Sequence, residues 1–227
     1  MGFLDILRDK TFYVLLFSGF FAFTGRTYMQ SGYKLYGSSC GIDDNFLSFT
    51  GSVAMVTGGF GRILWAWLID LYGFKRISVL VYSAVSLLFV TLPLISDYKY
   101  VYLIWVALLF LGNGSTQPMF GAVCGTIWGP ATGGKVFGLV VGMMGISGLI
   151  IGILQGVLIS KIGYINMLMI LVVATVICVL MILLLFTPRR YEESVESPLL
   201  KEETADFQSS ESTFSRSKSD STDQSSL

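Results

Sequence analysis

Long apolar stretches without charged residues dominate the first 187 residues of the chain. About 20 apolar residues in a helix cross about 30 Å of hydrocarbon, so the gaps between charged residues measure candidate membrane spans. Six predominantly apolar stretches occur, at 11–30, 46–69, 77–95, 101–124, 136–160 and 165–186, and only the first two contain a charged residue, an arginine in each. The pattern predicts an all-α integral membrane domain over residues 1–187 with six transmembrane helices.

The composition supports this class and excludes several others. Of the 227 residues, 53% are hydrophobic, 13% are charged and none is histidine. Such a composition is typical of membrane proteins, and the missing imidazole excludes histidine metal sites, triads and pH switches. The three cysteines have neither zinc-site nor disulfide-framework spacing. We therefore expect no enzyme, no metal, no cofactor and no nucleic-acid partner.

Basic residues at the ends of the spans predict the orientation. Seven lie on one side and three on the other: Arg8, Lys10, Lys75, Arg76, Lys135, Arg189 and Arg190 against Lys34, Lys99 and Lys161. Cytoplasmic loops carry the excess of Lys and Arg. Both termini are therefore predicted to be cytoplasmic, in the plasma membrane or in an internal organelle membrane.

The last 40 residues differ sharply from the rest. Residues 188–227 contain 11 serines and nine acidic against five basic residues, with few apolar ones. Such a segment does not bury enough apolar area to fold, and its serines are candidate phosphorylation sites. We predict a disordered, acidic, Ser-rich cytoplasmic tail. One interpretation of the whole chain is therefore a non-transporting membrane scaffold, or regulatory half, that acts through this tail.

Two arginines fall inside predicted spans. Arg26 lies in the first span, because only 15 uncharged residues separate it from Lys10. It either snorkels to the outer headgroups or faces a wet cavity that attracts anions. Arg62 lies about 12 Å deeper than Asp70, too far for an intrahelical ion pair. It either fixes packing through an interhelical contact or binds a carboxylate in a water-filled pathway.

Two further patterns distinguish the fourth and fifth spans. The segment GNGSTQP at 112–118 predicts a bend, because proline cannot donate a backbone hydrogen bond. The carbonyl groups freed at the bend, together with the side chains of Asn113 and Gln117, either line a cavity or form hydrogen bonds between helices. The fifth span carries glycines at 138, 142, 145, 148, 152 and 156. This spacing keeps them near one helical face, where close approach of another helix is expected.

These residues resemble the major facilitator superfamily. WLIDLYGFKR at 67–76 is similar to its cytoplasmic loop signature, which Asp70, Gly73, Lys75 and Arg76 match; Ala66 stands where Gly is usual and Leu71 where a basic residue is frequent. GSTQPMFGAVCGTIWG followed by GKVFGLVVG resembles the fourth and fifth helices of the carboxyl-terminal six-helix half, as in an oxalate/formate antiporter-like or monocarboxylate-transporter-like protein. The resemblance implies half of a major facilitator fold, built as a 3+3 inverted repeat.

The resemblance also implies a function. Arg62 falls where anion-carrying members keep a substrate-binding arginine, while Gly58 occupies the place of the acidic residue of proton-coupled members. We therefore expect transport of a small organic anion, a monocarboxylate or an oxalate-like one, by alternating access. Arg62 would hold the carboxylate, Arg26 would raise the local anion concentration, and Asn113 and Gln117 would orient the remainder. Asp70 and Arg76 would stabilise one conformational state.

The expected partners follow from the number of helices. A carrier of this superfamily normally binds its substrate between two six-helix halves. This chain contains one set of six predicted spans, so a second six-helix half or a second copy of the chain is expected beside it, with lipid around them. The alternatives are a fragment of a longer carrier and a degenerate half kept for another role.

Overall fold

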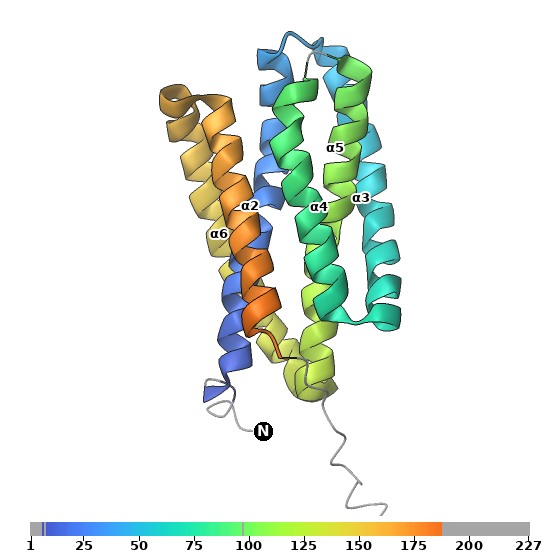
Figure 1. Cartoon of the computed structure of the whole chain (residues 1–227), viewed down its shortest axis with the longest axis vertical. Helices are drawn as coiled ribbons and strands as arrows, with labels where there is room; N and C mark the ends of the chain where they lie inside the picture. The colour runs from blue at the N-terminus through green and yellow to red at the C-terminus, as the bar shows by residue number, and fades with distance from the viewer. Residues whose placement is uncertain (1–5, 7, 97, 188–227) are drawn as a thin grey trace, which may run out of the picture. The chain divides into compact units, whose positions relative to one another are not determined.

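The computed structural model describes residues 6, 8–96 and 98–187, with the side chains of residues 130, 131, 158 and 160 left out. Its regular structure is helical: α2 (Lys10–Ser39), α3 (Asp44–Tyr72), α4 (Phe74–Ile95), α5 (Lys99–Gly114), α6 (Thr116–Leu180) and a π-helical turn, η1 (Met181–Leu185). The helices lie alongside one another as an up-and-down bundle (Figure 1). The predicted tail, 188–227, lies outside the described residues.

Glycine turns divide α6 into three segments. Gly129 and Gly163 have φ angles of 73° and 78°, a region that side chains disfavour, and the chain reverses direction at both. The segments are 116–128, 130–162 and 164–180, the last continuing through η1. Because only Ser115 separates α5 from the first segment, these two form one interrupted rod. The described chain thus contains six helical rods. In chain order they are α2, α3, α4, the interrupted rod 99–128, the segment 130–162 and the segment 164–185.

Four helices are long and apolar enough to cross a membrane: Asp44–Tyr72, Phe74–Ile95, Thr132–Val157 and Lys161–Leu185. The other two rods depart from simple membrane spans in recognisable ways. α2 contains Arg26 and several hydroxyl and amide side chains, and α5 has only 16 residues before the interruption. The structure therefore supports an all-helical membrane protein, while six crossings and a 3+3 repeat stay predictions.

Side-chain and glycine caps set several helix ends. The Asp9 carboxylate accepts a hydrogen bond from the Thr11 amide at 2.9 Å, and the Asp43 carboxylate accepts from the Asn45 and Phe46 amides. Such caps satisfy amides that have no partner within the helix. Gly73 ends α3 with a φ of 82°. The short connections that follow from these caps place successive helices antiparallel.

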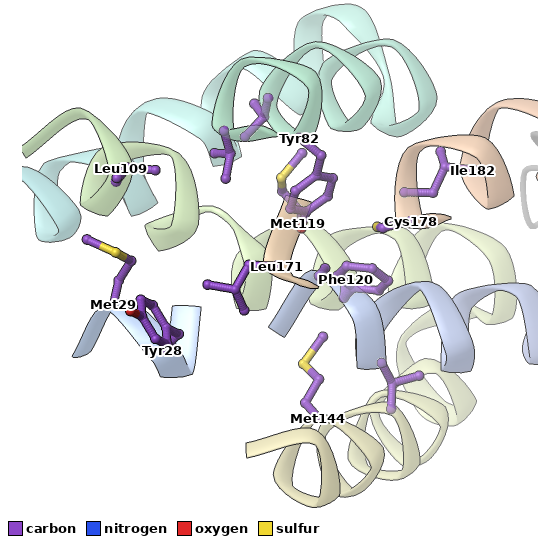
Figure 2. Packing of buried hydrophobic residues seen from close by; sticks show 14 of the residues in the cluster. Tyr28, Met29, Tyr82, Leu109, Met119, Phe120, Met144, Leu171, Cys178 and Ile182 are labelled. Carbon is purple, nitrogen blue, oxygen red and sulfur yellow. The ribbon is translucent and has the colours of Figure 1, made fainter. Parts of the chain in front are cut away.

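The core is filled by aromatic, methionine and aliphatic side chains from every helix. α2 packs chiefly against α6, α3 against α5, and α4 against both α5 and α6. Figure 2 shows Tyr82 of α4 and Met119, Phe120 and Cys178 of α6 directed into the space between the helices. The Cys178 thiol donates to the Ser18 carbonyl at 3.3 Å and so links the last segment of α6 to α2.

The outer surface is strongly apolar. Leu94, Leu149 and Leu184 are each at least 70% exposed. In water such a surface would be unfavourable, whereas in a bilayer it meets hydrocarbon at no cost. The exposed side chains therefore suit an integral membrane protein.

The glycine strip of the fifth rod does not pack as expected. A Cβ atom added at Gly148 would lie 3.5 Å from the Thr27 hydroxyl, but one at Gly138, Gly142, Gly145, Gly152 or Gly156 would have no neighbour within 4 Å. The strip therefore faces away from the described helices at five of its six positions. Direct contact between backbones through glycine occurs instead between α3 and α5, and between two segments of α6, where a Cβ at Gly133 would lie 2.6 Å from the Cys124 carbonyl oxygen.

Candidate functional site

The crossing of α3 and α5 brings two backbones into direct contact. A Cβ at Gly61 would lie 2.5 Å from the Leu111 carbonyl oxygen, and one at Gly114 would lie 2.5 Å from the Gly58 carbonyl oxygen. No residue with a side chain fits at these distances. Small residues permit such close approach between membrane helices. This crossing carries Arg62 of α3 to the neighbourhood of Asn113 of α5.

Two hydrogen bonds from α3 to carbonyls of α5 reinforce the crossing. The Thr57 hydroxyl donates to the Ala107 carbonyl at 3.2 Å, and the Trp65 indole donates to the Leu111 carbonyl at 2.9 Å. The two acceptors lie one helical turn apart. The contact is therefore fixed along the helix axis as well as in distance.

The interruption of the fourth rod has a local cause. Pro118 has no N–H to donate to the Gly114 carbonyl. The amide and the hydroxyl of Ser115 both donate to the Gly112 carbonyl, at 3.1 and 2.6 Å, and the Thr116 hydroxyl donates to the Asn113 carbonyl. The helix is thus interrupted at Ser115, within the segment 112–118 for which a bend was predicted. However, the carbonyls of Gly112 and Asn113 are bonded within it, so they are not the free polar lining that we expected.

A cavity of about 140 Å³ lies beside this break, between α2, α3 and α5. Its lining contains two cationic, two amide, three glycine and three apolar residues: Arg26, Met29, Gln30, Met55, Gly58, Gly59, Arg62, Phe110, Asn113 and Gly114. Three of the four residues predicted to bind substrate thus meet at one cavity. No acidic side chain belongs to this lining.

Arg26 reaches the cavity from α2, and its guanidinium has a hydrogen-bond donor without an acceptor. Its Nη1 atom is buried and has no hydrogen-bond partner, while the guanidinium lies 5.6 Å from the centre of the Phe23 ring. The charge of Arg62 acts unfavourably on that of Arg26. A bound anion would supply both the missing acceptor and the missing negative charge.

Arg62 enters the cavity from α3 and is exposed. Among the residues that the structure describes, the one ion pair joins Lys34 and Asp44, at 2.9 Å, near the α2–α3 connection. No carboxylate or carbonyl of the described chain therefore holds the Arg62 guanidinium. It is free to bind a ligand in the cavity.

Asn113 is 3% exposed, and its Nδ2 atom is buried without a hydrogen-bond partner. Its Oδ1 atom lies 3.5 Å from where a Cβ at Gly25 of α2 would be. The amide is thus enclosed between α5 and α2. A buried amide donor without a partner is costly unless a ligand or water occupies the adjoining space.

Gln117 lies elsewhere. It borders a separate groove with Pro118, Gly121, Phe137 and Val141. Gln30, in contrast, lines the cavity although we did not select it. The sequence could have indicated this position, because Gln30 follows Arg26 by four residues and residues at this spacing share one helix face.

The loop signature between α3 and α4 has two structural roles. Gly73 donates its amide to the Ile69 carbonyl at 2.8 Å, and Lys75 donates to the Phe186 carbonyl at 2.9 Å, which ties the start of α4 to the end of the last rod. Asp70 and Arg76 are exposed, and no ion pair joins them in the described structure. Their stabilisation of one conformational state stays a prediction.

Comparison with known families identifies the class of protein. The family model described as Major Facilitator Superfamily matches residues 15–218, which is most of the chain. The chain therefore belongs to the major facilitator superfamily, whose members are membrane transporters and not enzymes. No curated protein matches the sequence.

Gly61→Ala tests the α3–α5 crossing. The new methyl group would meet the Leu111 carbonyl, so the helices must separate, and the free energy of unfolding should fall by about 1–3 kcal/mol. Chemical unfolding of the purified chain in detergent measures this change. Gly145→Ala, where a Cβ meets nothing within 4 Å, is the matched control and should leave stability unchanged or slightly higher. Equal destabilisation by both substitutions would contradict the crossing.

Proposed function

We propose that this protein transports a small organic anion, a monocarboxylate or an oxalate-like one, and binds it in the cavity between α2, α3 and α5. One observation carries the proposal: unpaired guanidinium and amide groups surround a cavity whose lining contains no acidic residue. Membership of a transporter family supports movement of the ligand across the membrane by alternating access.

Each polar residue has a distinct role in this proposal. The planar guanidinium of Arg62 binds the carboxylate through two parallel hydrogen bonds. Asn113 donates from Nδ2 and fixes the orientation of the bound anion. Arg26 supplies a second positive charge and an unused donor, Nη1. Gln117 lines a different groove, so it has no contact with an anion held here.

Electrostatics favours an anion over a neutral solute. A charged side chain within a bilayer is costly unless it meets water or a partner of opposite charge. A neutral molecule that displaces water from the cavity leaves both guanidinium groups less solvated, whereas an anion replaces the lost hydration with a direct interaction. Selectivity therefore follows from the cost of leaving Arg26 and Arg62 unpaired.

The exposure of Arg62 supports a further protein domain or subunit that completes the site. Lipid does not solvate a guanidinium in the middle of a span, so protein or water must cover this face of α3. The proposal places a second six-helix half, or a second copy of the chain, across the cavity. Both termini face the cytoplasm in this arrangement, in the plasma membrane or an organelle membrane.

Arg62→Ala is expected to lower uptake of radiolabelled acetate and oxalate at least about thirtyfold, because the carboxylate loses its charged, bidentate partner. Uptake is measured in proteoliposomes that contain the purified chain. Arg62→Lys keeps the positive charge but loses the planar group that forms two parallel hydrogen bonds, so its uptake should lie between those of the wild type and the alanine variant. Resistance to alkaline extraction shows that each variant is still inserted. Wild-type uptake by Arg62→Ala would remove Arg62 from the site.

Arg26→Gln tests the second cation. Removing one of two positive charges should weaken binding of the dianion oxalate about tenfold and that of the monoanion acetate about threefold, because the lost attraction scales with ligand charge. Equilibrium binding to the purified chain in lipid nanodiscs provides the two affinities. Arg8→Gln, the same change at an exposed residue outside the cavity lining, is the control and should alter neither. Equal effects of Arg26→Gln and Arg8→Gln would show that Arg26 does not act on the bound anion.

A further inference from the structure

The Trp65 side chain makes an unusual contact beside the cavity without lining it. Its indole Nε1 atom donates to the Leu111 backbone carbonyl at 2.9 Å, across the α3–α5 crossing. Trp65 is half-buried and lies three residues after Arg62, one turn further along α3. Leu111 lies two residues before Asn113.

The Leu111 carbonyl lacks its usual helical donor. In an α-helix it would accept from the amide four residues later, that of Ser115. That amide donates instead to the Gly112 carbonyl at 3.1 Å, because α5 ends at this point. The Trp65 indole therefore replaces a hydrogen bond that the break removes from the fourth rod.

The same carbonyl also defines the closest approach of α3, since a Cβ at Gly61 would lie 2.5 Å from it. Gly61 sets the distance between the helices, and the directional indole bond sets the rotation and axial position of one against the other. Arg62 and Asn113 are carried by these two backbones. Their relative position thus depends on the Trp65 bond.

We propose that Trp65 is a positioning residue of the anion site: its bond to Leu111 holds the interrupted fourth rod in the register that directs Asn113 toward the ligand of Arg62. The inference rests on the proposed function, because it assigns Trp65 to that same site. It adds a residue outside the cavity lining to the set that determines affinity.

Trp105 offers a matched control. Its indole donates to the Thr91 hydroxyl, also at 2.9 Å, and joins α4 to α5. Neither Trp105 nor Thr91 lines the cavity. Trp65→Phe and Trp105→Phe therefore each remove one interhelical indole bond and keep an aromatic ring, but only the first should alter the relative position of Arg62 and Asn113.

The first test compares oxalate and acetate binding to the two variants, purified as the full chain in lipid nanodiscs. Trp65→Phe should raise the Kd for both anions about tenfold, and Trp105→Phe should leave both within about twofold of the wild type, while the two unfolding temperatures fall by similar amounts. An unchanged Kd in Trp65→Phe, or equal weakening in both variants, would overturn the proposal.

The second test does not require anion binding. Asn113→Cys is introduced into a chain whose three cysteines are replaced by alanine, and its rate of modification by a small hydrophilic thiol reagent is measured. Trp65→Phe should change that rate several-fold, because residue 113 shifts relative to the cavity, and Trp105→Phe should not. The same rate in all three backgrounds would overturn the role of Trp65. A wild-type chain that binds neither anion would count against the proposed function instead.

Discussion

An arginine side chain within the apolar length of a membrane helix needs water or an acceptor, and this requirement governs the site. Arg26 and Arg62 both lie in such positions, and the described chain gives neither an acidic partner. Both border the cavity between α2, α3 and α5, where Arg26 has an unpartnered buried donor and Arg62 is exposed. The glycine contact of α3 with α5 is what allows Arg62 and Asn113 to border the same cavity. We propose that a ligand with negative charge completes this arrangement.

The helical membrane class could be predicted from the sequence because it depends on composition and length alone. Gaps between charged residues located every rod that the structure describes, although α2 extends to Ser39, beyond the expected end at residue 30. The difference has a physical reason: residues 31–39 are partly polar but still pack against other helices, since the Ser31 hydroxyl donates to Gln155 of α6 at 2.6 Å and Tyr36 is buried. Charge gaps measure apolar length, whereas a helix continues wherever its backbone bonds are satisfied.

The site could be predicted only in part. Unpaired arginines in apolar spans are visible from sequence because they conflict with their surroundings, and the structure places both at one cavity. The sequence did not indicate which glycines allow two helices to pack closely. The regular strip at 138–156 is mostly open, while Gly58, Gly61 and Gly114 contact backbone. Gln117 was selected as a polar side chain of the segment 112–118, expected to line a cavity at the bend, but it borders another groove.

Water access beside Arg62 is the most direct test of the account. Gly59→Cys places a thiol in the cavity wall, where a Cβ meets no neighbour, and Phe60→Cys places one on the exposed side of α3 turned away from the cavity lining. In a chain without other cysteines, a hydrophilic thiol reagent should modify Cys at position 59 much faster than at position 60, and oxalate should slow only the former. Equal, slow reaction at both positions, or no protection by oxalate, would contradict an aqueous anion site at Arg62.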